Sequence, residues 1–392
     1  MFLDELDKFY SKNELKENMR ILNNLPSTFN EFAKEGLYIY GDGLLGKFAI
    51  EQMRKAQKRI IGIITSDNSK VGSSYQDIPY VRNDDLGNGF IIICSFHYLQ
   101  IQGTLNLHGY SKFLYYELLP LIYDEIQAYY IGFNSNYWDV LLSQKEKIRD
   151  FFELIQHDDL SVQVLNDVLM YRITFDSKYL DHAFSASVEK GVQYFDKDII
   201  KLTSRETFVD CGGFDGETSE SFIKEAHNMY KEIFLFEPDC KIIENTKIRM
   251  KNYDNIRFMP FGIGEKEEQL RFSVMGSNGG GAIGQSGDYD IKVVSLNKTL
   301  KNVHPSYIKM DIEGSEKEAL RGAEEIIRRE IPKMAISIYH HPEDIVEIVD
   351  WIGKLNLNYK FYVRHYSRNY ADTVLYCIPE KYLTDDPDGE IL

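Results

Sequence analysis

The chain contains 392 residues, enough for two compact domains, and its 43 % hydrophobic and 27 % charged residues are typical of a globular protein. Its formal net charge of −16, without a long run of lysine or arginine, disfavours binding to nucleic acid or to anionic membranes. The N-terminus carries acidic residues where a signal peptide needs basic ones, and no apolar stretch is long enough to span a bilayer. These features predict a soluble, cytoplasmic protein.

Four segments are predicted along the chain. Residues 1–35 form a polar helical segment, and residues 36–137 alternate strands and helices, which is typical of a small Rossmann-like α/β domain with a parallel sheet. Residues 138–200 have helical periodicity and form a connector whose apolar positions are equally compatible with a homo-oligomer interface. Residues 201–392 form a second, larger α/β domain.

A glycine-rich turn opens the first of these α/β domains. Short buried strands are predicted at 37–40, 59–65 and 89–95. The turn with Gly41, Gly43 and Gly46 follows the first strand and precedes a helix, and Asp67 lies close to the spacing at which dinucleotide-binding domains place an acid. The segment is also similar to the nucleotide-binding-like domain attached to several sugar-modifying enzymes. The segment is compatible with a bound nucleotide, and equally with a domain that keeps the nucleotide-binding fold but binds no ligand.

The larger domain is predicted to be a doubly wound sheet with a hairpin at one edge. Its seven strands are expected at 207–211, 232–237, 255–261, 307–311, 333–340, 360–366 and 373–378. Its helices are expected at 217–228, 239–251, 315–329 and 342–355. Sheets of this kind bind ligands beyond the carboxyl ends of their strands, where the strand order reverses.

The first strand of this domain runs into an acidic glycine turn, VDCGGFDGETS. Gly212, Gly213 and Gly216 permit close backbone approach to a ligand, but their spacing is not that of a dinucleotide-binding or phosphate-binding loop. Asp210 and Asp215 make the turn a poor site for pyrophosphate and a better one for a cationic ligand. S-adenosylmethionine, which carries a sulfonium and an ammonium, is such a ligand.

The second strand ends in a carboxylate, Glu237, followed by Pro238. Nucleoside-binding sheets present an acid at this point to the two ribose hydroxyls. The same residues also suit the beginning of a helix, since proline is favoured in the first turn and Asp239 suits the helix dipole.

The fourth strand delivers Asp311 and Glu313 to the same edge of the sheet, before a helix that begins at Ser315. Ser315 and Glu318 have the spacing of a capping box, which explains the end of this motif without any function. It does not explain the two acids at the end of the strand.

These motifs together resemble the FkbM family of S-adenosylmethionine-dependent O-methyltransferases. The similar stretches run in order from about residue 203 to 379: VDCGGFDGETS, FLFEPD, YIKMDIEGSEKEALRGAEEII, AISIYHHPEDI, FYVRHYS and DTVLYCIP. The resemblance implies that Asp210, Gly212 and Gly216 shape the cofactor pocket, that Glu237 holds the ribose, and that Asp311 and Glu313 lie beside the transferred methyl group. The candidate cofactor-binding residues are Asp210, Gly212, Gly213, Asp215, Gly216, Thr218, Glu237, Pro238, Asp311 and Glu313.

Two features depart from the family pattern. Gly213 stands where many members have alanine, a difference expected to leave cofactor binding intact. No residue in the segment 258–264 is a clear candidate to bind the adenine of the cofactor.

Methyl transfer to oxygen requires a positioned base, and histidine is the usual one near neutral pH. His340 ends the fifth strand and is the candidate base, with Asp311, His365 and Tyr339 as helpers. His340 is also explained as a residue that merely ends a strand before the next helix. A competing mechanism uses a divalent metal held by Asp311, Glu313 and His340, although their spacing specifies no coordination set.

The sequence therefore predicts an O-methyltransferase. The resemblance implies a hydroxyl acceptor on a sugar, nucleotide-sugar or related glycan precursor, as in polysaccharide biosynthesis. Two alternatives remain open: an NAD(P)-linked sugar-modifying oxidoreductase that uses the first α/β domain, and a non-catalytic nucleotide-binding protein. A glycine-rich segment, 277–287, is predicted to be a turn between two strands rather than a lid.

Overall fold

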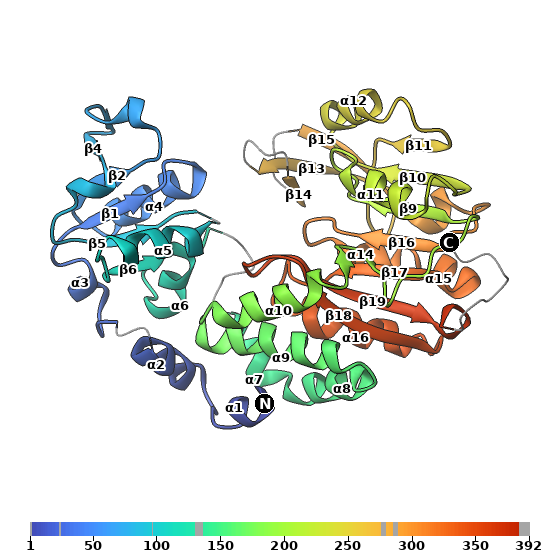
Figure 1. The fold of residues 1–392 in the computed structure, drawn as a ribbon, viewed down its shortest axis with the longest axis horizontal. Coiled ribbons are helices and arrows are strands. Elements are labelled where there is room, and N and C mark those ends of the chain that lie inside the picture. Colours follow the sequence, from blue (N-terminus) through green and yellow to red (C-terminus); the bar gives the residue numbers. More distant parts are fainter. Residues whose placement is uncertain are drawn as a thin grey trace. The chain divides into compact units, whose positions relative to one another are not determined.

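The computed structural model describes residues 2–22, 25–95, 97–129, 136–275, 280–284 and 289–383 (Figure 1). The chain divides into two compact units: Met1–Lys145 with Leu169–Tyr179, and Glu146–Val168 with Leu180–Leu392. The predicted helical connector, 138–200, is thus shared between the two units rather than forming a segment of its own.

The first unit contains a six-stranded sheet in the order β3-β4-β2-β1-β5-β6. Its strands are β1 (Leu37–Tyr40), β2 (Ile60–Ile64), β3 (Ser74–Tyr75), β4 (Ile78–Val81), β5 (Phe90–Ile93) and β6 (Phe113–Tyr115). All neighbours are parallel except β3 and β4. The three strands predicted here are present as β1, β2 and β5, with apolar residues buried on both faces as parallel strands require.

Helices of the first unit and of the connecting region are short. They are α1 (Phe2–Leu6), α2 (Lys12–Leu22), α3 (Phe29–Phe32), α4 (Leu44–Lys55), α5 (Tyr98–Leu107), α6 (Leu119–Ile122), α7 (Asn136–Ser143), α8 (Lys145–Ile155), α9 (Asp159–Thr174) and α10 (Lys178–Val188). A two-stranded ribbon of β7 (Gly191–Val192) and β8 (Phe195–Asp196) follows. No helix of the described residues is long and apolar enough to cross a membrane. A homo-oligomer formed through these helices stays a prediction.

The second unit is built on a seven-stranded sheet in the order β11-β10-β9-β16-β17-β19-β18, which descends in this order in Figure 1. The strands are β9 (Thr207–Cys211), β10 (Glu232–Phe236), β11 (Ile256–Met259), β16 (Tyr307–Met310), β17 (Lys333–Ser337), β18 (Tyr359–His365) and β19 (Thr373–Pro379). Neighbouring strands are parallel except at β19, which is antiparallel to both β17 and β18. All seven predicted strands and the edge hairpin are confirmed, and the strand order reverses between β9 and β16.

The helices of this unit are α11 (Glu217–Glu225), α12 (Cys240–Arg249), α13 (Leu296–Thr299), α14 (Glu316–Arg321), α15 (Glu324–Glu330) and α16 (Asp344–Lys354). The helical periodicity is clearest in α16, where Ile345, Ile348, Val349 and Ile352 are all buried.

The single helix predicted at 315–329 is wrong, because the structure breaks it into α14 and α15. In a continuous helix the Ile326 amide would bond to the Gly322 carbonyl. Here the Asn297 amide donates to the Gly322 carbonyl at 2.9 Å, while the Asn297 side chain accepts from the Ile326 amide at 3.1 Å. Asn297 therefore binds both the carbonyl and the amide that would bond to each other in a continuous helix, and the helix is interrupted between them. The proposed capping box is absent too, since the Ser315 side chain makes no capping hydrogen bond.

A second, four-stranded sheet has the order β12-β15-β13-β14. Its strands are β12 (Gly262–Ile263), β13 (Glu268–Met275), β14 (Gly280–Gly284) and β15 (Tyr289–Val294). The glycine-rich segment predicted to be a turn is therefore partly a strand: Gly280–Gly284 pairs with β13, because glycine does not prevent backbone pairing. Its remaining residues, 277–279 and 285–287, lie outside the described part of the chain.

The second unit buries both an aromatic cluster and a charged group. Phe208 and Phe222 stack at 4.4 Å between ring centroids, and Tyr307 lies against Phe208 at 5.2 Å. Arg364, only 1 % exposed, donates to Asp196 at 2.7 Å and to Asp158 at 2.8 Å. This ion-pair network ties the edge strand β18 to the chain that precedes the sheet.

Replacing Arg364 by methionine should lower the free energy of unfolding by about 3–5 kcal/mol, because Asp196 would stay buried without its partner. Urea unfolding of the full-length chain, followed by circular dichroism, measures this loss. The matched control is Arg368→Met, which removes the exposed ion pair with Asp181 and should change stability by less than about 1 kcal/mol. Equal losses in the two variants would contradict the prediction.

Candidate active site

The glycine turn lies across the ends of three strands. The amides of Gly212 and Gly213 donate to the Phe236 carbonyl at the end of β10, at 3.1 and 2.8 Å. Gly212 has a φ of +82°, and a Cβ there would lie 1.9 Å from the Asp311 carbonyl oxygen beyond β16. The turn therefore requires glycine at this position for both its conformation and its close approach.

The two other glycines of the turn are also constrained. Gly216 has a φ of +89° and is the N-cap of α11. A Cβ on Gly213 would lie 2.4 Å from Leu235 Cγ. Leu235 of β10 already fills the space beside Gly213, so an alanine there would require that side chain to shift. The expectation that glycine at residue 213 leaves cofactor binding intact stays a prediction.

A buried ion pair stabilises the glycine turn from the interior of the protein. Asp210, fully buried, lies 3.1 Å from the Lys309 ammonium and accepts a hydrogen bond of 2.7 Å from Ser219. Lys309 also donates to the Gly212 carbonyl at 2.7 Å. Burial by itself opposes the charge on Lys309, but Asp210 and Asp311 raise its pKa. Asp210 thus stabilises the turn and α11 from within the protein.

Lys309 was missed by the sequence reasoning, although a signal exists. It is the one charged residue of the apolar strand β16, and a buried charge requires a partner. The register places it directly opposite Asp210 on β9. That register follows from the pairing of strands far apart in the chain.

Glu237 lies at the end of β10, as predicted, and faces the glycine turn. It is 6 % exposed, and its carboxylate accepts a 2.8 Å hydrogen bond from the Asp239 amide. Burial raises the pKa of Glu237 to about 7, opposed by the amides of Asp239 and Phe214. Phe214 belongs to the glycine turn, so the turn and Glu237 approach one another. Asp239 is the N-cap of α12, and half-buried Pro238 precedes it.

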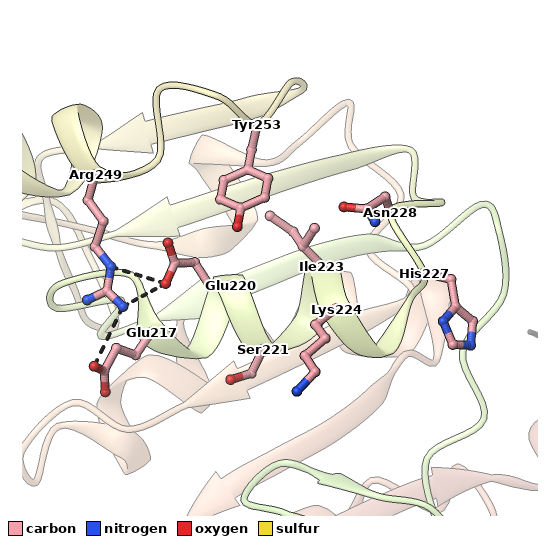
Figure 2. Close-up of a pocket in the computed structure, with 9 residues that line it drawn as sticks. All are labelled: Glu217, Glu220, Ser221, Ile223, Lys224, His227, Asn228, Arg249 and Tyr253. Carbon is pink, nitrogen blue, oxygen red and sulfur yellow. Dashed lines mark hydrogen bonds and ion pairs between the residues drawn. The ribbon is translucent and has the colours of Figure 1, made fainter.

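Two candidate cofactor residues lie at the beginning of α11, Asp215 just before it and Thr218 in its first turn. Asp215 accepts a 2.6 Å hydrogen bond from Arg249 of α12, and Thr218 is half-buried in the first turn of α11. Arg249 also pairs with Glu220 and lies 3.6 Å from Glu217, at one end of a surface hollow of about 690 Å³ (Figure 2). The carboxylate of Asp215 is thus held by this surface network.

A cluster of polar residues lies at the carboxyl ends of β16 and β17. The carboxylate of Asp311 accepts hydrogen bonds from the hydroxyls of Tyr194, at 2.9 Å, and Tyr339, at 3.1 Å. We call this cluster the Asp311 centre: Tyr194, Asp311, Glu313, Glu316, Tyr339 and His340. Burial opposes the charged form of Asp311, but Lys309 and His340 hold its pKa below the usual value. Asp311 is therefore an ionised hydrogen-bond acceptor.

His340 is surrounded by carboxylates. Its Nδ1 lies 3.1 Å from Glu316, and its Nε2 lies 3.5 Å from Asp311 and 3.6 Å from Glu313. Burial favours the neutral ring, but Glu316 and the two other acids outweigh it and raise the pKa of His340 to about 10. An imidazolium accepts no proton, so the predicted base role requires that this proton first be displaced.

Further residues reach this region from outside the predicted motifs. Tyr194 precedes the sheet, and its neighbour Gln193 donates to the carboxylate of Asp372 at 3.3 Å. Burial, and then the charge of Asp311, raise the pKa of Asp372 to about 6. No local pattern indicated Tyr194 or Asp372, since their positions depend on how the hairpin and the preceding ribbon pack.

His365 is not brought into the Asp311 centre. It is fully buried on the edge strand β18, with Nδ1 2.9 Å from the Thr373 hydroxyl. The reason is strand order: β19 lies between β17 and β18, so the end of β18 is separated from His340 by a strand.

In the first unit, two glycines make the close approaches expected of a nucleotide-binding turn. A Cβ on Gly46 would lie 2.0 Å from the Gly41 carbonyl, and Gly41 has a φ of +111°, whereas a Cβ added to Gly43 would meet no atom within 4 Å. Asp67 accepts hydrogen bonds from Ser69. Nucleotide binding at Gly41, Gly43, Gly46 and Asp67 stays a prediction.

Comparisons with known proteins agree with this geometry. Residues 210–361 match the family model described as the methyltransferase FkbM domain. The crystal structure of a methyltransferase FkbM from Methylobacillus flagellatus KT is similar to 94 % of this chain and 100 % of its own, with a TM-score of 0.69 and 20 % identity. At this identity the likeness shows the fold alone.

Two further solved structures share less. An rRNA methylase from Streptococcus thermophilus is 13 % identical over 45 % of this chain and 87 % of its own, with a TM-score of 0.30. Fibrillarin from Aeropyrum pernix, in complex with S-adenosyl-L-methionine, is 12 % identical over 50 % of this chain and 73 % of its own, with a TM-score of 0.32. No curated protein sequence matches the chain.

The sheet, its glycine turn and the family match define an S-adenosylmethionine-dependent methyltransferase. More particularly, the residues that match the methyltransferase FkbM domain, 210–361, all lie in the second unit.

Alanine at residue 212 should weaken binding of S-adenosylhomocysteine at least tenfold, because a positive φ and a contact with the Asp311 carbonyl both exclude a Cβ. Calorimetric titration measures the affinity. Gly353→Ala is the control: Gly353 lies in α16 with no atom within 4 Å of an added Cβ, so binding should be unchanged. Wild-type affinity in Gly212→Ala would refute this role of the turn.

Affinity for S-adenosylhomocysteine should also depend on pH through Glu237. With a pKa of about 7, its carboxyl is mostly protonated at pH 6 and mostly ionised at pH 8. Hydrogen bonds to a carboxylate are stronger by about 1 kcal/mol or more, so affinity should rise several-fold between these pH values. Glu237→Gln should remove the rise. A variant that keeps the wild-type pH profile would exclude Glu237 as its source.

Proposed function

We propose that the chain transfers a methyl group to a hydroxyl oxygen of a small polar substrate, namely a sugar, a nucleotide-sugar or a related glycan precursor. The observation that carries the proposal is the position of Asp311. Its backbone carbonyl touches the glycine turn at Gly212, and its carboxylate faces the hydroxyls of Tyr194 and Tyr339. One residue thus adjoins both the cofactor turn and a polar centre.

The cofactor is S-adenosylmethionine, which supplies an activated methyl group on sulfur. The chain holds it between the turn at Gly212–Gly216 and the carboxylate of Glu237, which accepts hydrogen bonds from the ribose hydroxyls. The absence of room for a Cβ at Gly212 and Gly213 packs the turn tightly against Asp311 and Leu235, at the ends of β16 and β10. Asp210 and Lys309 hold that turn rigid from the protein side.

The chain's chemical task is then to align an oxygen nucleophile and to accept one proton. A carboxylate has room for up to about four hydrogen bonds, and the two tyrosines occupy two positions on Asp311. Asp311 accepts the hydroxyl proton of the substrate as the oxygen–carbon bond forms and the carbon–sulfur bond breaks. His340 and Lys309 stabilise the carboxylate in its ionised form.

The proposed substrate class is supported by the residues around this centre. Gln193, Asp372 and the two tyrosine hydroxyls provide both donors and acceptors within one short region. A substrate with several hydroxyl groups matches such a lining better than an apolar one. The resemblance to the FkbM family supports the same class.

The test is methyl transfer by the full-length chain from labelled S-adenosylmethionine to a panel of nucleotide-sugars, with mass spectrometry to locate the methyl group on oxygen. Asp311→Asn should lower turnover by about 10²–10⁴-fold, because the base is lost. Its affinity for S-adenosylhomocysteine should stay within a few-fold of the wild type. Asp181→Asn, a change in an exposed ion pair, is the matched control.

Two results would count against the proposal: a wild-type chain that does not bind S-adenosylhomocysteine, or wild-type turnover in Asp311→Asn. Calorimetric binding of NAD(P)H in place of S-adenosylhomocysteine would favour the oxidoreductase alternative through the first unit.

A further inference from the structure

A small hollow of the second unit contains none of the residues assigned to the cofactor or to the acceptor. Its volume is about 200 Å³, and side chains of three helices, α8, α14 and α16, line it. All of these residues belong to the second unit. Pockets for drug-sized ligands measure roughly 300–1,000 Å³, so this hollow suits a ligand of a single ring.

Part of the lining of this hollow is apolar. Leu320 of α14 is 1 % exposed and Ile348 of α16 is fully buried, and the half-buried indole of Trp351 lines the hollow with them. Trp351 is one of only two tryptophans in the chain. An indole face that stays accessible within a hollow is a stacking surface for a ring that has C–H groups on one side.

The rest of the lining is charged, with a local excess of cations. Lys147 of α8 and Lys354 of α16 both pair with one acid, Asp350, at 3.2 and 2.8 Å. The two other cations, Lys317 and Arg321, each pair with two acids. One carboxylate therefore faces two ammonium groups, although the chain has a net charge of −16. An anionic group beside these two lysines would balance the excess.

Helical spacing brings the different groups of the lining together. Glu347, Asp350, Trp351 and Lys354 follow the pattern i, i+3, i+4, i+7 in α16, so they share one face of that helix. Lys317 of α14 donates to the Glu347 carboxylate at 2.9 Å. A carboxylate accepts up to about four hydrogen bonds, so both acids retain acceptor positions for the hydroxyl groups of a ligand.

We propose that this hollow binds a six-membered sugar ring that carries an anionic group, either a carboxylate or a phosphate. The ring stacks on Trp351, and its hydroxyl groups donate to Glu347 and Asp350. The anionic group lies beside the ammonium groups of Lys147 and Lys354. This site is separate from the methyl-transfer centre, and the inference does not depend on the proposed function.

The test is the tryptophan fluorescence of the full-length chain during titration with D-glucuronate, D-glucose 6-phosphate, D-glucose or inorganic phosphate. Trp351 is the responsive group, because the other tryptophan, Trp138, is fully buried in the first unit. We expect a saturable change with at least one of the two acidic sugars, and the tighter of them identifies the anionic group. Glucose should bind at least about tenfold more weakly, because it makes no charge-assisted contact. Phosphate alone should give no change, because it has no ring to stack on the indole.

Variants of the lining separate the contributions of charge and stacking. Lys147→Gln and Lys354→Gln should each weaken binding of the acidic sugar about tenfold. The matched control is Lys298→Gln, since Lys298 also forms an exposed ion pair, with Glu267, but does not line the hollow. Trp351→Ala should abolish binding, as measured by saturation-transfer NMR on the sugar, which needs no tryptophan signal.

Titration of each variant with S-adenosylhomocysteine shows that it is folded, and its affinity should equal that of the wild type. Absence of a saturable response to both acidic sugars would overturn the site. Equal affinity for glucose, or an equal response to inorganic phosphate, would contradict the ligand class. If Trp351→Ala fails to fold, the two lysine variants decide, and wild-type affinity in both would overturn the proposal. Each of these outcomes leaves the transferase proposal standing.

Discussion

The second unit depends on the buried ion pair between Lys309 and Asp210. It joins the two strands at which the sheet order reverses, β9 and β16, and Lys309 also donates to the carbonyl of Gly212. A buried charge without its partner is strongly destabilising, so each of these residues requires the other. The pair thereby fixes the glycine turn against the end of β16, which is the geometry that a ligand at this edge of the sheet needs.

Lys309 also affects the charge of Asp311, two residues further along the chain. Asp311 extends from the end of β16, and the charge of Lys309 is the strongest influence that keeps its carboxyl ionised despite burial. One cation therefore supports both the cofactor turn and the carboxylate of the proposed transfer. Beyond Asp311 the region is rich in acids, and His340 is the group that lies among them.

Backbone conformation is unusual where these parts meet. Three non-glycine residues of the region have positive φ angles: Phe214 at +43°, Glu313 at +56° and Asp372 at +65°. Such conformations are unfavourable by about 1 kcal/mol or more and persist only where the surrounding structure enforces them. Each lies just beyond a strand end or just before a strand begins, so the rigid sheet supplies the enforcement and the turns present the functional groups.

The sequence by itself determined the local elements: the seven strands, the acidic glycine turn, and the carboxylates Glu237 and Asp311 at strand ends. Each depends on periodicity or composition within a few consecutive residues. Only the tertiary structure decided that Lys309 pairs with Asp210, that Tyr194 meets Asp311, and that β19 separates His365 from His340. These relations join residues far apart in the chain, and strand order, which no local pattern encodes, sets them.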